Sequence, residues 1–157
     1  MHGAGGSGQT LRVSLNFCSS TDARKELKVR DVFPFILVGA GSMLGGVCRY
    51  CMTLLTQGIS AFSVPYGTLV SNTLGCLVIG VIAGITGKTE LLSTEMRLLL
   101  ATGFCGGFTT LSSFIYELGQ LVQDKEFYYA SFYLIATLAG AGLAFIAGLL
   151  ISDLILR

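Results

Sequence analysis

The sequence predicts an all-α membrane protein with four transmembrane helices, and its composition is the first reason. The 157 residues are 52% hydrophobic and 12% charged, and the mean hydropathy is +0.73. A soluble domain carries about 25% charged residues. The second reason is that long uncharged runs follow one another from Val32 onward. Since a bilayer core needs about 20 apolar residues per helix, these runs predict membrane spans.

Each expected helix follows from one of the uncharged runs, which cover residues 32–48, 50–87, 98–116 and 127–152. The second run is too long for one span, and Gln57, Gly58 and Pro65 place a turn in its first half. We therefore expect helices at residues 33–53, 66–86, 94–122 and 127–151. Pro34 and Pro65 would then lie in first helical turns, where proline is tolerated.

The chain divides into two regions. Residues 1–31 are rich in Gly, Ser, Thr and charge, so we expect a disordered polar tail, without the apolar stretch of a cleaved secretory signal. Residues 32–157 form the four-helix transmembrane domain. The one histidine is His2, and the 10 basic residues nearly balance the 9 acidic ones. These counts argue against histidine-dependent enzymes and against nucleic-acid binding.

The third expected helix contains Gly103, Gly106 and Gly107, followed by a run of hydroxyl residues. This pattern predicts a helix broken at mid-membrane. Its freed backbone groups cannot face lipid, so they would face protein, water or an ion. The alternative is that the glycines only permit close helix packing. We favour packing for the small residues spaced four apart in the other helices: Gly41 and Gly45, Gly80 and Gly84, and Gly140, Ala144 and Gly148.

Three polar side chains within the spans indicate function, because polar groups are costly in lipid. Asn72 would share a helix face with Thr68 and Gly75 and donate hydrogen bonds into a cavity. Arg49 is either functional or an interfacial anchor. Glu117 is either a proton relay or, as we favour, a hydrogen-bonded structural group.

A CxxC pair, Cys48 and Cys51, has the spacing of a redox or metal motif. It has neither a second CxxC nor an internal histidine beside it. We therefore interpret these cysteines as small apolar packing residues.

Three sequence blocks resemble those of the Fluc (CrcB) fluoride channels: GAGSMLGGVCRY at residues 39–50, PYGTLVSNTLG at 65–75 and GFCGGFTTLSSF at 103–114. The resemblance implies an antiparallel dimer in the plasma membrane that passively exports fluoride through two pores. Its fluoride path would include Asn72, Leu111 and Phe114, with the hydroxyls of Ser112 and Ser113 beside them. Tyr133 and Thr137 match pore-facing positions of the fourth helix, and Arg49 matches a residue near a vestibule. A sodium ion would lie at the dimer interface on backbone carbonyls that map to Gly106 and Thr109.

Two features depart from the family pattern. Leu111 replaces the first of two phenylalanines in the third block, so the partner is either a second copy of this chain or a homologous subunit that supplies the missing ring. The charge distribution is also uneven. If the helices alternate, the side holding the N-terminus carries Arg12, Arg24, Lys25, Lys28, Arg30, Lys88, Arg97 and Arg157, and the other carries Arg49 and Lys125. This bias predicts one preferred orientation. An antiparallel homodimer would then require that the tail is removed or that its charges count little.

Two other functions remain open on the residues alone. A proton-coupled exporter of small solutes would use Glu117 as its relay. A non-transporting membrane assembly protein would use the glycines for packing only. An enzyme is disfavoured, because no nucleophile has an internal histidine base or a metal cluster beside it.

Overall fold

The computed structural model describes residues 29–58, 64–89 and 91–157, and within these residues all regular structure is helical. The elements are α2 (Val29–Gln57), α3 (Tyr66–Lys88), α4 (Thr94–Arg97), the π-helical segment η1 (Leu98–Cys105), α5 (Gly106–Phe108), α6 (Leu111–Gln123) and α7 (Phe127–Ile155). Four stretches are long and apolar enough to cross a membrane: Val32–Gln57, Tyr66–Lys88, Thr94–Gln123 and Phe127–Ile155. The prediction of four membrane-spanning helices is confirmed.

The helices extend beyond most of the predicted ends. The first begins at Val29, so Pro34 lies inside α2 and not in its first turn, while Pro65 directly precedes α3. The expected boundary between residues 31 and 32 therefore falls within a helix. A helix satisfies its backbone groups internally, so it can continue from lipid into water without a change of structure. The rest of the expected tail, residues 1–28, lies outside the described residues.

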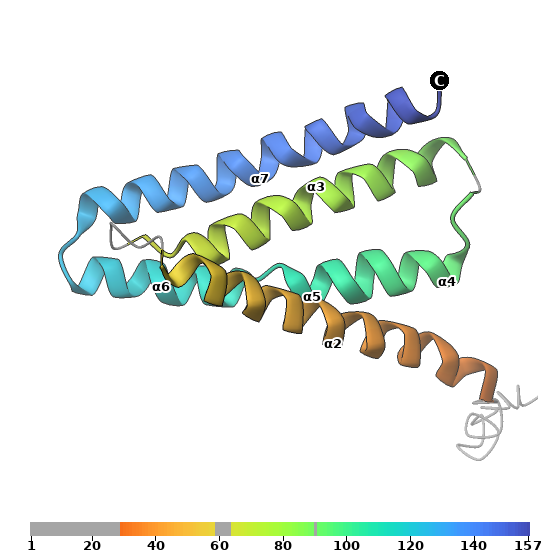
Figure 1. Cartoon of the computed structure of the whole chain (residues 1–157), viewed down its shortest axis with the longest axis horizontal. Coiled ribbons are helices and arrows are strands. Elements are labelled where there is room, and N and C mark those ends of the chain that lie inside the picture. Colours follow the sequence, from red (N-terminus) through yellow and green to blue (C-terminus); the bar gives the residue numbers. More distant parts are fainter. Residues whose placement is uncertain (1–28, 59–63, 90) are drawn as a thin grey trace, which may run out of the picture.

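The four spans form two parallel pairs (Figure 1). α3 and α7 run side by side in one direction, and α2 and the third span run in the other. The start of α2, the α3–α4 connection and the C-terminus consequently lie at the same end of the bundle.

Glycines bring the backbones of α3 and α7 into contact. A Cβ atom at Gly80 would collide with the Phe145 carbonyl, and one at Gly84 with the Ser152 side chain. A Cβ atom at Gly148 would collide with the Leu77 carbonyl of α3. The packing interpretation of these small residues is confirmed, because side chains would separate the two helices.

The same kind of contact joins α2 to the third span. Cβ atoms at Gly41 and Gly45 would collide with backbone atoms of the third span, and one at Gly107 would collide with Ser42. Gly103, Gly106 and Gly107 are all helical. The expectation that these glycines interrupt the helix is therefore wrong for the glycines themselves. Gly103 and Gly107 contact α2, whereas Gly106 has open space around it.

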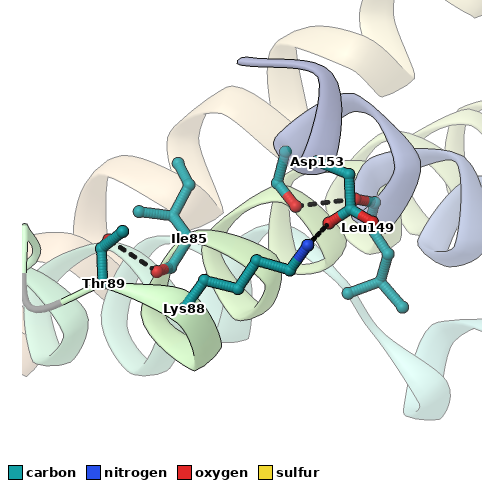
Figure 2. A network of polar contacts seen from close by, with 6 residues as sticks. Ile85, Lys88, Thr89, Leu149 and Asp153 are labelled. Carbon is teal, nitrogen blue, oxygen red and sulfur yellow. Dashed lines mark hydrogen bonds and ion pairs between the residues drawn. The ribbon is translucent and has the colours of Figure 1, made fainter. Parts of the chain in front are cut away.

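An ion pair joins the C-terminal ends of α3 and α7 (Figure 2). The Lys88 Nζ lies 2.7 Å from Asp153 Oδ1, and the Thr89 hydroxyl donates to the Ile85 carbonyl in the last turn of α3. Along the spans, by contrast, many large apolar side chains are exposed, including Phe35 and Leu55 of α2 and Leu143 of α7. An exposed apolar surface of this extent is typical of contact with lipid or with another subunit.

Candidate functional site

The third span contains two residues that are not helical. α5 ends at Phe108 and α6 begins at Leu111, while Thr109 (φ −83°, ψ 154°) and Thr110 (φ −152°, ψ 120°) are extended. Each threonine forms hydrogen bonds with backbone groups at the helix end beside it. The Thr109 N–H and hydroxyl both donate to the Cys105 carbonyl at 2.9 Å, and the Thr110 hydroxyl accepts from the Ser113 N–H at 3.2 Å. Thr110 is therefore an N-cap of α6, a position that favours threonine.

Asn72 of α3 pairs with the backbone of Thr110 in both directions. The Thr110 N–H donates to Asn72 Oδ1 at 2.7 Å, and Asn72 Nδ2 donates to the Thr110 carbonyl at 3.1 Å. One turn along α3, Gly75 faces Thr109, and a Cβ atom there would collide with the Thr109 methyl group. Both extended residues therefore pack against α3. Thr110 bonds the Asn72 amide, and Thr109 occupies the space beside Gly75, which has no side chain.

A cavity of about 240 Å³ lies beside these contacts. Its wall combines the extended residues with side chains of α3, α6 and α7: Asn72, Cys76, Ile79, Thr109, Thr110, Leu111, Phe114, Thr137, Leu138 and Ala141. Thr137 is only 5% exposed, and its hydroxyl has no hydrogen-bond partner among the described residues. Buried hydroxyls are nearly always paired, so this one is available to a ligand or water in the cavity.

Behind the cavity, aromatic and acidic side chains form one hydrogen-bonded cluster. The Phe114 and Tyr133 rings lie 5.1 Å apart, and both side chains are almost fully buried. The Tyr133 hydroxyl donates to Glu117 Oε2 at 2.6 Å, and the Thr68 hydroxyl donates to Glu117 Oε1 at 2.8 Å. Both carboxylate oxygens of Glu117 are engaged, which supports the structural interpretation of this residue.

Gly106 lies near the carbonyl end of the first half of the third span, and Arg49 reaches this end from α2. Arg49 Nε donates to the Gly107 carbonyl at 3.4 Å, close to the negative end of that half-helix. In a continuous helix the Gly106 carbonyl would accept from the Thr110 N–H. That N–H donates to Asn72 instead, so the Gly106 oxygen is left without its helical partner.

The structure brings only some of the predicted site residues together. Asn72, Leu111, Phe114 and Thr137 line the cavity, with Thr109 beside them. The other predicted residues lie outside it. Tyr133 packs behind Phe114, and Ser112 and Ser113 bond the Thr110 hydroxyl in the first turn of α6. Gly106 belongs to α5, and Arg49 reaches the end of α5 from α2.

Thr110 is the residue whose importance the sequence reasoning did not isolate. Its signal was present, since a threonine that precedes an apolar helical run is a typical N-cap. A metal site of the side-chain type is not formed in the described part of the chain, where no three His, Cys, Asp or Glu residues gather. Oxygen donors near the two extended residues are carbonyls and hydroxyls, which suit a hard cation.

Comparison with known proteins relates the chain to one family. Residues 36–149 match the family model described as CrcB-like protein, Camphor Resistance (CrcB). The fluoride-specific ion channel FluC of Prosthecochloris aestuarii is 49% identical over 113 residues, which cover 71% of this chain and 85% of that protein. FluC of Chlorobaculum tepidum is 45% identical over 119 residues, which cover 76% and 94%, and FluC of Leptospira interrogans is 34% identical over 111 residues, which cover 70% and 87%.

These matches confirm the resemblance drawn from the three sequence blocks. They also agree with the four spans, which describe a multi-pass membrane protein. The family is one of channels and not of enzymes. The chain belongs to the CrcB family of membrane channels.

Proposed function

We propose that this chain is a fluoride-specific ion channel that lets fluoride leave the cell passively across the plasma membrane. The observation that carries the proposal is the cavity at the two extended threonines, where four residues of the expected fluoride path meet. Relatives that are 34% to 49% identical carry the name fluoride-specific ion channel FluC.

The cavity lining suits a small, strongly hydrated anion. The Asn72 amide, the free Thr137 hydroxyl and the positive edge of the Phe114 ring each offer a weak electropositive contact. α6 also begins at this cavity, so its N-terminal dipole end favours negative charge there. Lys and Arg are absent from the residues that line the cavity. An anion can therefore be held weakly enough to leave again, as conduction requires.

The proposed assembly is an antiparallel dimer with two pores. Leu111 lies on the cavity wall but is 70% exposed, and Gly106 faces open space. A partner subunit that covers these positions would close the cavity into a conduit. The partner is either a second copy of this chain or a homologous subunit, as the leucine at position 111 leaves open.

The third span in this proposal is a broken membrane helix, and its break holds a sodium ion at the dimer interface. Gly106 and Thr109 would supply carbonyl oxygens, and the residues fit this role because the Gly106 oxygen lacks its helical partner. The ion would supply positive charge at the carbonyl end of the half-helix, where the dipole is negative. Ser112 and Ser113 provide a polar track at the start of α6.

The decisive experiment measures fluoride efflux from liposomes that contain the purified protein, with chloride as the comparison ion. We expect rapid fluoride efflux and negligible chloride efflux. Asn72→Asp and Phe114→Ile should abolish the flux, because they alter the cavity wall. Ile115→Val serves as a matched control on the exposed side of α6 and should leave flux unchanged. Absence of fluoride efflux, or equal efflux of chloride, would overturn the proposal.

A further inference from the structure

We infer that Asn72 is a positioning residue for the cation site, and that it acts by keeping the Gly106 carbonyl free. The inference rests on the proposed function, since it concerns the sodium site assigned there. It adds a second role for a side chain otherwise placed only in the anion path. The side chain joins the two sites through the peptide group of Thr110.

The Thr110 N–H has two possible acceptors, one in its own span and one in α3. In a continuous helix the Thr110 N–H would donate to the carbonyl of Gly106, four residues earlier. Asn72 Oδ1 accepts this N–H at 2.7 Å instead, so a side chain of α3 competes with a carbonyl of the third span. As long as the Thr110 N–H donates to Asn72, the Gly106 oxygen is available to another ligand.

The asparagine side chain matches both polar groups of the Thr110 peptide. Its Nδ2 holds the Thr110 carbonyl at 3.1 Å while its Oδ1 holds the N–H. Asn72 is 9% exposed, so water does not readily replace it. Without this pairing, two backbone groups would lie unsatisfied at membrane depth, where each costs several kcal/mol. They would regain a partner by rebuilding the helix, which consumes the Gly106 carbonyl.

Different atoms of the Asn72 side chain serve the cation site and the anion path. Only the acceptor Oδ1 keeps the Thr110 N–H away from Gly106, and aspartate keeps this acceptor. Asn72→Asp should therefore retain the cation site while its carboxyl group disables the anion path. Asn72→Leu, of similar shape, lacks both the donor and the acceptor and should lose both functions.

The test measures sodium binding without measuring transport. The thermal stability of the detergent-purified protein is recorded against NaCl, with N-methyl-D-glucamine chloride replacing it at constant ionic strength. A ligand that binds only the folded state raises the melting temperature in proportion to its occupancy. We expect the sodium concentration for half-maximal stabilisation to rise at least tenfold in Asn72→Leu and to change less than threefold in Asn72→Asp.

Thr137→Val is the matched control, because it alters the same cavity from α7 and the Thr137 hydroxyl forms no hydrogen bond with Thr110. It should reduce fluoride efflux and leave the sodium response unchanged. If Asn72→Leu does not fold, Asn72→Ser replaces it, since its hydroxyl is too short to reach Thr110. If the sodium concentration for half-maximal stabilisation is unchanged in Asn72→Leu or Asn72→Ser, the positioning role of Asn72 is overturned, but the sodium site is not. No sodium response in the wild-type protein would overturn the sodium site together with this inference, while fluoride efflux would still test the channel.

Discussion

The α3–α7 pair and the third span use the same glycine packing but differ in backbone conformation, because only the third span contains extended residues. Gly80, Gly84 and Gly148 hold α3 and α7 in contact as two uninterrupted helices. Gly103 and Gly107 hold the third span against α2 in the same way, yet this span has two extended residues directly afterwards. Glycine at membrane depth is therefore not what ends the helix.

What distinguishes the third span is that other groups accept the backbone bonds that a helix would make. Asn72 takes both polar groups of the Thr110 peptide, and the Thr110 hydroxyl caps α6. α3 and α7 have no interruption within their described lengths, and three of their hydroxyls bond carbonyls of their own helix: Thr73 to Leu69, Thr86 to Ile82 and Ser152 to Leu149. The comparison teaches that the non-helical residues depend on partners from α3 and on the Thr110 cap, and not on the glycines of their own span.

The largest effect is expected where the α3–α7 backbones touch. Gly148→Ala places a methyl group against the backbone of Leu77 and Val81, and overpacking of this kind costs about 1–3 kcal/mol. Gly142→Ala in the same helix meets nothing within 4 Å and should be neutral or slightly stabilising. Thermal unfolding of the purified proteins compares them. Equal melting temperatures for the two variants would contradict this account of the contact.

Gly75→Ala should affect transport at the third span more than folding. Its new methyl group would displace Thr109 and distort the cavity, so fluoride efflux should fall at least tenfold. Gly87→Ala, also in α3, has open space and should conduct like the wild type. Normal efflux in Gly75→Ala would show that the position of Thr109 does not matter for conduction.

Glu117→Gln tests the cluster that links the two regions. The amide retains one acceptor but loses the other, so stability should decrease by about 1 kcal/mol. Efflux should follow the fluoride gradient in both proteins, whichever way a pH gradient is applied. Glu95→Gln on the exposed helix α4 is the control. Flux that follows the proton gradient and disappears in Glu117→Gln would support the exporter hypothesis instead.

Leu111→Phe introduces the ring that the resemblance to the Fluc channels leads us to expect at this position. Because an aromatic edge is a better anion contact than an aliphatic side chain, efflux should be preserved or raised a few-fold. Ile115→Phe, one turn along α6 and exposed, should have no effect. Complete loss of efflux in Leu111→Phe would count against the assignment of this position to the fluoride path.

The smallest effect is expected at the end of the α3–α7 pair, where Lys88 and Asp153 form their ion pair (Figure 2). Their side chains are 54% and 45% exposed, and such pairs contribute at most about 1 kcal/mol. Lys88→Ala should change the melting temperature slightly, and less at high salt. The double variant with Asp153→Ala measures the coupling, and a large coupling energy would show that this end holds the pair together.

The sequence predicted the four spans but missed most of their ends. The uncharged runs indicate which residues cross the lipid. The helices nevertheless extend past them: α2 begins before its expected start, and α3 and α7 end after their expected ends. The two extended residues lie inside the expected segment of glycines and hydroxyl residues, at its threonines and not at its glycines. Gly103 and Gly107 drew attention because glycine weakens a helix, but they lie in its packed face. The signal for the true position was the pair of threonines that follows them.

By itself the sequence determined the all-α membrane class, the family and five of the ten residues that line the cavity. These are read from hydropathy and short motifs, which are local properties of the chain. The tertiary structure decided which partner each polar group takes. Asn72 and Thr110 are 38 positions apart and Thr68 and Glu117 are 49 apart. No periodicity within one helix brings such residues together, because only the packing of α3 against the third span and α7 sets which donor meets which acceptor.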